Sequence, residues 1–138
     1  MSAEVLGYEI SLDSASVVES DTEVRRQLWE YEAGTRERFD LSIAFPATFF
    51  GRVWRAVTAI PYGETRTYGE LAAELDTAPV AVGNANANNP LPVLVPCHRL
   101  VGTDSLRGYR YPGLKEALLR HENEAGLVEL GFDLDGSV

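Results

Sequence analysis

A helical spacing of apolar positions is clearest in the middle of the chain, over residues 49–60. One apolar stripe recurs there at helical intervals, and Pro61, Tyr62 and Gly63 end it. The stripe consists of Phe49, Phe50, Val53, Trp54, Val57 and Ile60. We therefore expect an amphipathic helix whose apolar side packs on a core.

Two further short helices are predicted directly after this one. Thr67 and Glu70 have the spacing of a capping box, which predicts a helix start with the following apolar residues facing inward. A turn at residues 76–78 leads to Pro79, a residue that suits the first turn of a helix. That second helix should run over residues 79–88. Two short helices joined by a tight turn indicate a helix-turn-helix.

The second of these helices carries small and polar side chains. Alanine and glycine alternate with asparagine: Ala81, Gly83, Ala85 and Ala87 with Asn84, Asn86 and Asn88. Such a slim, polar helix can approach another surface closely. The alternative is a poorly packed surface helix.

Prolines then punctuate residues 90–96 and predict a stiff, apolar, extended segment that ends at Cys97. A last helix is expected over residues 114–124. One of its sides carries Leu114, Leu118 and His121, and the other carries Lys115.

The first 43 residues predict a small α/β module of their own. Residues 5–12 have the composition of a strand. Asp21 is placed to cap a helix over residues 22–33, which Gly34 ends. One apolar face of that helix carries Val24, Leu28 and Tyr31. Residues 39–45 fit a short strand or a linker.

Composition narrows the class of protein. Apolar residues make up 45% of the 138, so we expect one packed domain with a small appended module. The sequence has no run of eighteen apolar residues and no basic residue near its start, so we expect neither a membrane span nor a secretory signal. A single cysteine excludes an internal disulfide and suits a reducing cytoplasm. One cysteine and two histidines offer no convincing metal site.

The net charge of −9 has the wrong sign for a protein that grips phosphates. Residues 51–122, however, hold 7 acids and 8 bases, between two acidic flanks, and 11 of the 12 basic residues are Arg. Acid-rich, Lys-poor composition suggests solubility in very high salt. An ordinary acidic cytoplasmic protein is an equally good interpretation.

Cys97 is the strongest candidate for a reactive residue. A lone cysteine is more often a small buried apolar side chain than a nucleophile. Here it ends a proline-stiffened segment and is followed by His98, which can accept the thiol proton. Glu122 on the last helix is a candidate to orient that imidazole, as in Cys-His pairs generally.

The blocks of sequence around Cys97 resemble the O6-alkylguanine-DNA alkyltransferases. The resemblance rests on residues 89–101 (Asn-Pro-Leu-Pro-Val-Leu-Val-Pro-Cys-His-Arg-Leu-Val), on residues 60–72 (Ile-Pro-Tyr-Gly-Glu-Thr-Arg-Thr-Tyr-Gly-Glu-Leu-Ala), and on residues 81–83, 108–109 and 114–122. It covers residues 45–122, and its Pro-Cys-His-Arg signature is highly specific. The implied fold is α+β: a mostly helical, winged helix-turn-helix-like alkyltransferase domain over residues 44–124, a short α/β module over residues 1–43, and an acidic tail over residues 125–138.

The resemblance also implies the function: one irreversible transfer of an alkyl group from O6-alkylguanine, with O4-alkylthymine as a second candidate base, onto Cys97. His98 would take the thiol proton, Glu122 would orient His98, Asn89 would hold the nucleophile segment, and Tyr68 would protonate the departing guanine. The flipped base would lie beside Val95, Tyr109 and Arg110. The DNA-binding residues would be Tyr68, Gly69, Val80, Ala81, Gly83, Asn84 and Ala87, with residues 79–88 in the minor groove. We expect no cofactor, double-stranded DNA as partner, a monomer, and a cytoplasmic location that becomes nucleoid-associated on DNA.

The chain departs from the family pattern at Val80, where the family has an arginine that fills the gap left by the flipped nucleotide. Either Val80 wedges the duplex, or a side chain near Arg99 substitutes, or repair is slow. The turn between Val101 and Lys115 is also shorter than usual, which would change the preference for alkyl size. Three other functions compete: a damage sensor without transfer, a helix-turn-helix transcription regulator, and a Cys-His hydrolase.

Overall fold

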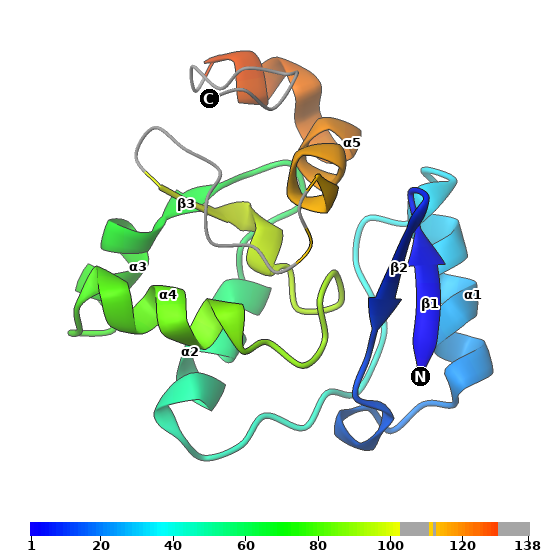
Figure 1. Cartoon of the computed structure of the whole chain (residues 1–138), viewed down its shortest axis with the longest axis horizontal. Coiled ribbons are helices and arrows are strands. Elements are labelled where there is room, and N and C mark those ends of the chain that lie inside the picture. The colour runs from blue at the N-terminus through cyan, green and yellow to red at the C-terminus, as the bar shows by residue number, and fades with distance from the viewer. Residues whose placement is uncertain (103–110, 112, 130–138) are drawn as a thin grey trace.

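The computed structural model describes residues 1–102, 111 and 113–129, and the side chains of its last helix as far as Asn123. It is mostly helical with two small sheets, as expected (Figure 1). The N-terminal strands and first helix lie on one side of the molecule, the helix-turn-helix lies on the other, and the last helix lies between them at the top of the view.

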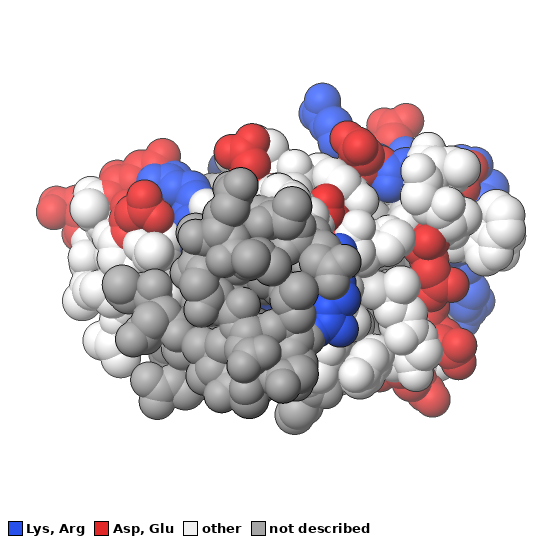
Figure 2. Space-filling model, turned by 90° about the horizontal axis from the view of Figure 1, so that it is seen from above, with Lys and Arg blue, Asp and Glu red and all other residues white. Residues whose placement is uncertain are grey.

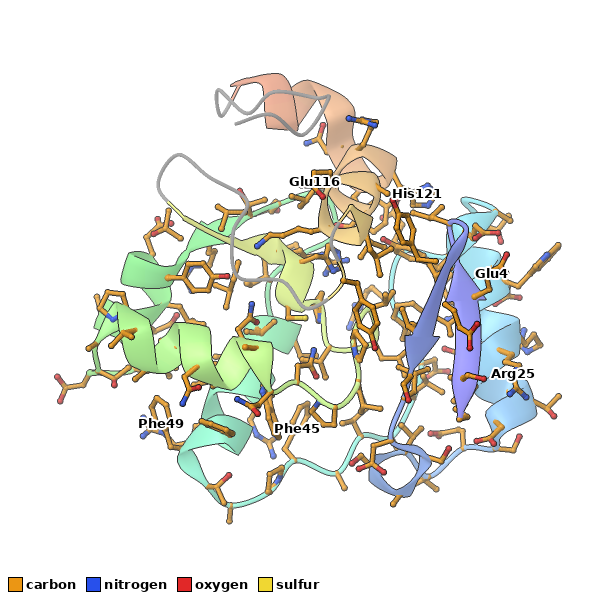
Figure 3. All side chains as sticks on the ribbon, viewed as in Figure 1. Glu4, Arg25, Phe45, Phe49, Glu116 and His121 are labelled. Atoms are coloured by element: carbon orange, nitrogen blue, oxygen red, sulfur yellow. The ribbon has the colours of Figure 1, made fainter. Side chains whose placement is uncertain are left out.

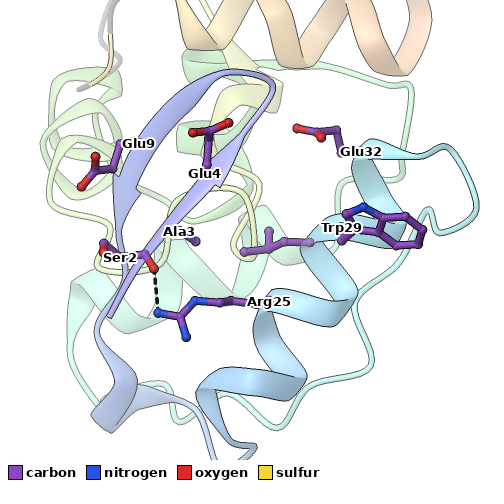
Figure 4. Close-up of a pocket in the computed structure, with 8 residues that line it drawn as sticks. Ser2, Ala3, Glu4, Glu9, Arg25, Trp29 and Glu32 are labelled. Carbon is purple, nitrogen blue, oxygen red and sulfur yellow. Dashed lines mark hydrogen bonds between the residues drawn. The ribbon is translucent and has the colours of Figure 1, made fainter.

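The N-terminal module is a hairpin packed on one helix. Strands β1 (Ser2–Val5) and β2 (Tyr8–Ser11) pair antiparallel, so the prediction of one strand over residues 5–12 is wrong. The reason is the turn between them, where Leu6 and Gly7 both have positive φ, 50° and 86°. In the groove between hairpin and helix, Arg25 donates a hydrogen bond to the Ser2 carbonyl at 3.0 Å (Figure 4).

Helix α1 (Asp21–Glu32) matches the predicted helix, with one shift at its start. Ser20, not Asp21, is the N-cap, and its side chain accepts from the Glu23 N–H. Gly34 follows the helix end with φ 81°, the left-handed conformation that favours glycine. The predicted apolar face is confirmed, because Val24, Leu28 and Tyr31 are all buried.

The helix-turn-helix and its flanking helix also form as predicted. Helix α2 (Phe49–Thr58) precedes strand β3 (Arg66–Thr67), and α3 (Tyr68–Glu74) opens with the complete capping box of Thr67 and Glu70. Helix α4 (Pro79–Ala87) follows, with Pro79 in its first turn and no side-chain cap. Short 3-10 helix Cys97–Arg99 then leads into β4 (Leu100–Val101), which pairs with β3 in parallel.

The proline-rich segment before Cys97 is not extended, so that prediction is wrong. It folds into a compact buried turn in which the Val95 N–H donates to the Leu91 carbonyl at 2.9 Å and Val93 has φ 73°. The Asn89 side chain stabilises this turn with two hydrogen bonds. Its Oδ1 accepts from the Leu91 N–H and its Nδ2 donates to the Val95 carbonyl, both at 2.9 Å.

Helix α5 (Leu114–Glu129) is kinked at Asn123 and extends past the predicted end at residue 124, into the segment assigned to the tail. Lys115, expected on a separate side of the helix from its apolar face, is buried instead. Its ammonium donates to the carbonyl of Leu100, three residues after Cys97, at 2.6 Å. The rest of the proposed tail, residues 130–138, lies outside the described residues.

Candidate active site

Cys97 lies at the start of the 3-10 helix and is 4% exposed. Its backbone is held from two sides: its N–H donates to the Val95 carbonyl at 2.7 Å, and its carbonyl accepts from Asn86 Nδ2 at 3.2 Å. Because Asn89 fixes that same Val95 carbonyl, two asparagines set the position of the cysteine.

The structure brings His98 and Glu122 together, 24 residues apart in the chain. His98 Nε2 lies 2.7 Å from Glu122 Oε2, and both side chains are almost fully buried. A carboxylate only accepts, so Nε2 carries the proton and Nδ1 is the free acceptor. Nδ1 is buried and makes no hydrogen bond to any described residue. The imidazole is therefore oriented with a lone pair ready for a proton.

Glu122 is the centre of a larger network than the sequence indicates. Arg99 forms a two-pronged pair with it, with Nε to Oε1 and a terminal nitrogen to Oε2 both at 2.9 Å. The Tyr31 hydroxyl donates to Oε2 at 2.7 Å, and the Gly63 N–H donates to Oε1 at 3.3 Å. Arg99 could have been singled out from its place in the Pro-Cys-His-Arg block. Tyr31 gave no signal beyond its place on an apolar helix face.

The pKa values of both Glu122 and His98 are lowered at this site. Burial alone would raise the pKa of Glu122, but the charges and hydrogen bonds of His98 and Arg99 outweigh it and hold that pKa well below its usual range. Burial lowers the pKa of His98, against the opposing effect of Glu122. At neutral pH the site therefore holds a carboxylate and a neutral imidazole, the form that can accept a proton.

Tyr68, the first residue of α3, is half-buried on the same side as Cys97. Its hydroxyl oxygen accepts from Asn86 Nδ2 at 3.4 Å, and the Lys115 ammonium lies 5.7 Å from the centre of its ring. Burial raises the pKa of Tyr68, so the hydroxyl keeps its proton. Sequence reasoning missed Asn86 because it alternates with two exposed asparagines, and only the fold turns it inward.

Lys115 places a second titratable group near the cysteine. Burial lowers its pKa to about 8, while the neighbouring Cys97 acts to raise it. Its ammonium, held by the hydrogen bond to the Leu100 carbonyl, thus lies close enough to Cys97 for the charges of the two groups to interact.

Most of the candidate DNA-binding residues on α3 and α4 are exposed at least in part. Gly69, Val80, Asn84 and Ala87 are exposed, and Ala81 and Gly83 are partly exposed. Val80 is 80% exposed. Helix α4 contains no charged residue.

Of the three candidate pocket residues, the structure describes only Val95. Val95 is buried and lines a hollow shared with Phe45 and Trp54, on the α2 side of the nucleophile segment. Tyr109 and Arg110 lie outside the described residues.

The described residues contain no group of three His, Cys, Asp or Glu side chains that could hold a metal ion. Within the same residues, no helix is long and apolar enough to cross a membrane.

Comparison with known proteins decides the family. The model of the 6-O-methylguanine DNA methyltransferase DNA-binding domain matches residues 48–124, which include Cys97, His98 and Glu122. The chain belongs to this family. The resemblance inferred from the Pro-Cys-His-Arg signature is thereby confirmed.

Relatives in this methyltransferase family come from archaea and bacteria. The chain is 47% identical over 105 residues to the methylated-DNA–protein-cysteine methyltransferase of Methanosarcina barkeri, covering 72% of this chain and 66% of that protein. It is 42% identical over 113 residues to the Archaeoglobus fulgidus protein, covering 75% and 76%. The match to the constitutive Bacillus subtilis protein spans only 55% of that protein's length.

Solved structures agree with the fold. The structure of Mycobacterium tuberculosis O6-methylguanine methyltransferase superposes with a TM-score of 0.64 at 39% identity, over 75% of this chain and 66% of that one. The same organism's OGT protein in complex with DNA gives a TM-score of 0.67 at 42% identity, over 75% and 67%.

Proposed function

We propose that this protein repairs DNA by moving a methyl or larger alkyl group from O6 of guanine to the sulfur of Cys97, once per molecule. The observation that carries the proposal is the buried His98–Glu122 pair, whose histidine directly follows the only cysteine, inside the family-matched segment. A pair of this kind converts a poorly nucleophilic thiol into a thiolate.

Activation of the sulfur uses the free lone pair of His98. The Cys97 thiol gives its proton to Nδ1, directly or through a bridging water, and Glu122 stabilises the resulting imidazolium through Nε2. The Lys115 charge favours the thiolate in the same way. No cofactor enters this step.

The transfer is a single displacement. A sulfur–carbon bond forms as the bond between that carbon and O6 breaks, and the electron pair of the broken bond stays on the guanine. Tyr68 donates its proton to the guanine anion, and the proton held on His98 restores Tyr68. Asn86 Nδ2 donates to the Tyr68 oxygen, and this hydrogen bond helps to stabilise the phenolate that remains when Tyr68 gives up its proton. The product is a thioether that no group in the site can hydrolyse.

The damaged base must leave the DNA duplex to reach Cys97, a residue that is 4% exposed. We place α4 in the minor groove, where its small residues allow close approach. Val80, at the exposed start of that helix, would enter the base stack in place of the arginine of the family pattern.

Binding would depend little on phosphate contacts. Helix α4 offers no charge, and acidic and basic side chains are interspersed on the described part of the face that Figure 2 shows from above. Shape and apolar contacts would then carry the affinity, which suits a protein that works in high salt.

The test is the intact mass of the protein after mixing with duplex DNA that contains O6-methylguanine. A gain of one methyl group, absent in Cys97→Ala, is expected. Tight binding with unchanged mass would instead identify a damage sensor. Many turnovers per molecule would identify a hydrolase.

A further inference from the structure

The N-terminal module reaches the catalytic network through one tyrosine. Tyr31 lies near the end of α1, is 0% exposed, and donates its hydroxyl to Glu122 Oε2 at 2.7 Å. A second contact ties the same two helices: His121 Nε2 lies 2.8 Å from the Tyr31 carbonyl oxygen. His121 is labelled where α5 approaches the module in Figure 3.

The Glu122 oxygen that accepts from Tyr31 is the same oxygen that contacts His98, the general base. Glu122 Oε2 also takes the hydrogen bond from His98 Nε2, so only one atom separates the tyrosine from the imidazole. From Oε2 to the proton-accepting Nδ1 the path runs through a single ring.

Ring packing explains the burial of Tyr31 but not its hydroxyl. The ring contacts Phe39, Tyr62 and His121 with centroid separations of 5.5, 6.1 and 5.0 Å. A phenylalanine would keep those contacts. The specific contribution of a tyrosine at this position is therefore the hydrogen bond from its hydroxyl to Glu122.

We propose that Tyr31 is a positioning residue for alkyl transfer, so that the N-terminal module completes the site by fixing the carboxylate that holds His98. The inference rests on the proposed function and extends it to a residue outside the family-matched segment.

The hydroxyl would act in two ways. It fixes the rotation of the carboxylate so that Oε2 faces His98. As a donor it also withdraws part of the negative charge from that oxygen, which lessens the pull of Glu122 on the His98 proton. The other groups around the pair come from each neighbouring element: Arg99 beside His98, Tyr62 after α2, and Lys115 on α5. Burial, followed by Glu122, raises the pKa of Tyr31, so the hydroxyl remains a donor throughout the working range.

In Tyr31→Phe the two contacts from Arg99 still hold the Glu122 carboxylate in place, so the loss of the donor decides the sign of the change in the pKa of His98. Without the donor, the carboxylate stabilises imidazolium more strongly and the pKa of His98 rises. The acid limb of the transfer rate against pH then moves to higher pH. The rate constant at neutral pH falls about tenfold, the lower end of the loss seen when a hydrogen-bond partner that orients a metal-bound histidine is removed.

The matched control is Tyr62→Phe. It removes a hydroxyl from a ring that contacts Tyr31 and Arg99, yet no hydrogen bond joins Tyr62 to Glu122. Single-turnover rates for both variants are measured with the same O6-methylguanine duplex from pH 5 to 9. Slower transfer with a displaced acid limb in Tyr31→Phe alone supports the proposal. Unchanged rate and limb in Tyr31→Phe overturn it.

A second measurement separates this inference from the proposed function. The pKa of His98 is followed by NMR of the imidazole nitrogens in free protein, which needs no DNA. It should rise in Tyr31→Phe and fall when 3-fluorotyrosine, a stronger donor of nearly the same size, is placed at position 31. If the wild type fails to take a methyl group but His98 moves this way, the proposed function fails and the positioning role stands. If His98 titrates identically in all three proteins, the positioning role fails whatever the transfer assay gives.

Discussion

The buried pair of Arg99 and Glu122 supports a quantitative prediction for Arg99→Met. Arg99 is 6% exposed, its guanidinium makes two contacts to Glu122 at 2.9 Å, and a third contact joins it to the Ile60 carbonyl at 2.8 Å. Methionine preserves much of the apolar stem but removes all three.

Removing one partner of a buried ion pair leaves the other charge without compensation, and this typically costs about 3–5 kcal/mol. In Arg99→Met the Glu122 carboxylate keeps only His98, Tyr31 and the Gly63 N–H. Because small domains are stable by about 5–15 kcal/mol, the variant should lose roughly a fifth or more of its free energy of unfolding. The pKa of Glu122 should rise as well.

The assay is urea unfolding at pH 7, followed by tryptophan fluorescence. Arg26→Met is the matched control, since Arg26 also meets two carboxylate groups, at 2.6 and 2.8 Å, but its side chain is 52% exposed. Exposed pairs of this kind contribute about 0–1 kcal/mol. If Arg99→Met cost no more than Arg26→Met, the view of Glu122 as a charge that depends on its partners would be refuted.

Three further outcomes follow from the same structure. The free energy of unfolding should fall on acidification, because the pKa values of His98 and Glu122 are lower in the folded protein than in the unfolded chain. The unfolded chain therefore takes up protons at His98 below about pH 6.5 and at Glu122 below about pH 4.5, while the folded protein does not. An unfolding midpoint that stays constant between about pH 7 and 4 would contradict this. Val80→Arg should speed transfer from duplex O6-methylguanine but not from O6-benzylguanine as a free base, which needs no flipping; equal acceleration of both substrates would show that Val80 acts elsewhere. The plot of log binding constant against log salt should have a slope shallower than about −3, since α4 brings no charge to the phosphates, whereas a slope near −7 would indicate an extensive basic interface.

Local signals predicted most of the helical framework. The capping box at Thr67, the proline at position 79 and the apolar stripe of α2 each act over one or two turns, and each helix formed where they indicated. The same holds for α1, whose start was misplaced by a single residue.

Features that depend on distant contacts could not be predicted in this way. The prolines before Cys97 suggested an extended chain, but the Asn89 side chain bonds both arms of a turn and bends it. Lys115 was expected on the other side of the last helix from its apolar residues, but the fold buries it and supplies the Leu100 carbonyl as an acceptor. The Tyr31 contact joins residues 91 positions apart, and nothing in either local sequence marks the partner.

The account depends most directly on where the alkyl group finishes and how many each molecule accepts. Wild-type protein should be mixed with excess duplex carrying isotopically labelled O6-methylguanine, digested, and its peptides sequenced by mass spectrometry. The account predicts one label per molecule, on the sulfur of Cys97, with no further uptake as DNA is added. Label on another residue, or continued loss of methyl groups from DNA after every Cys97 is occupied, would contradict it.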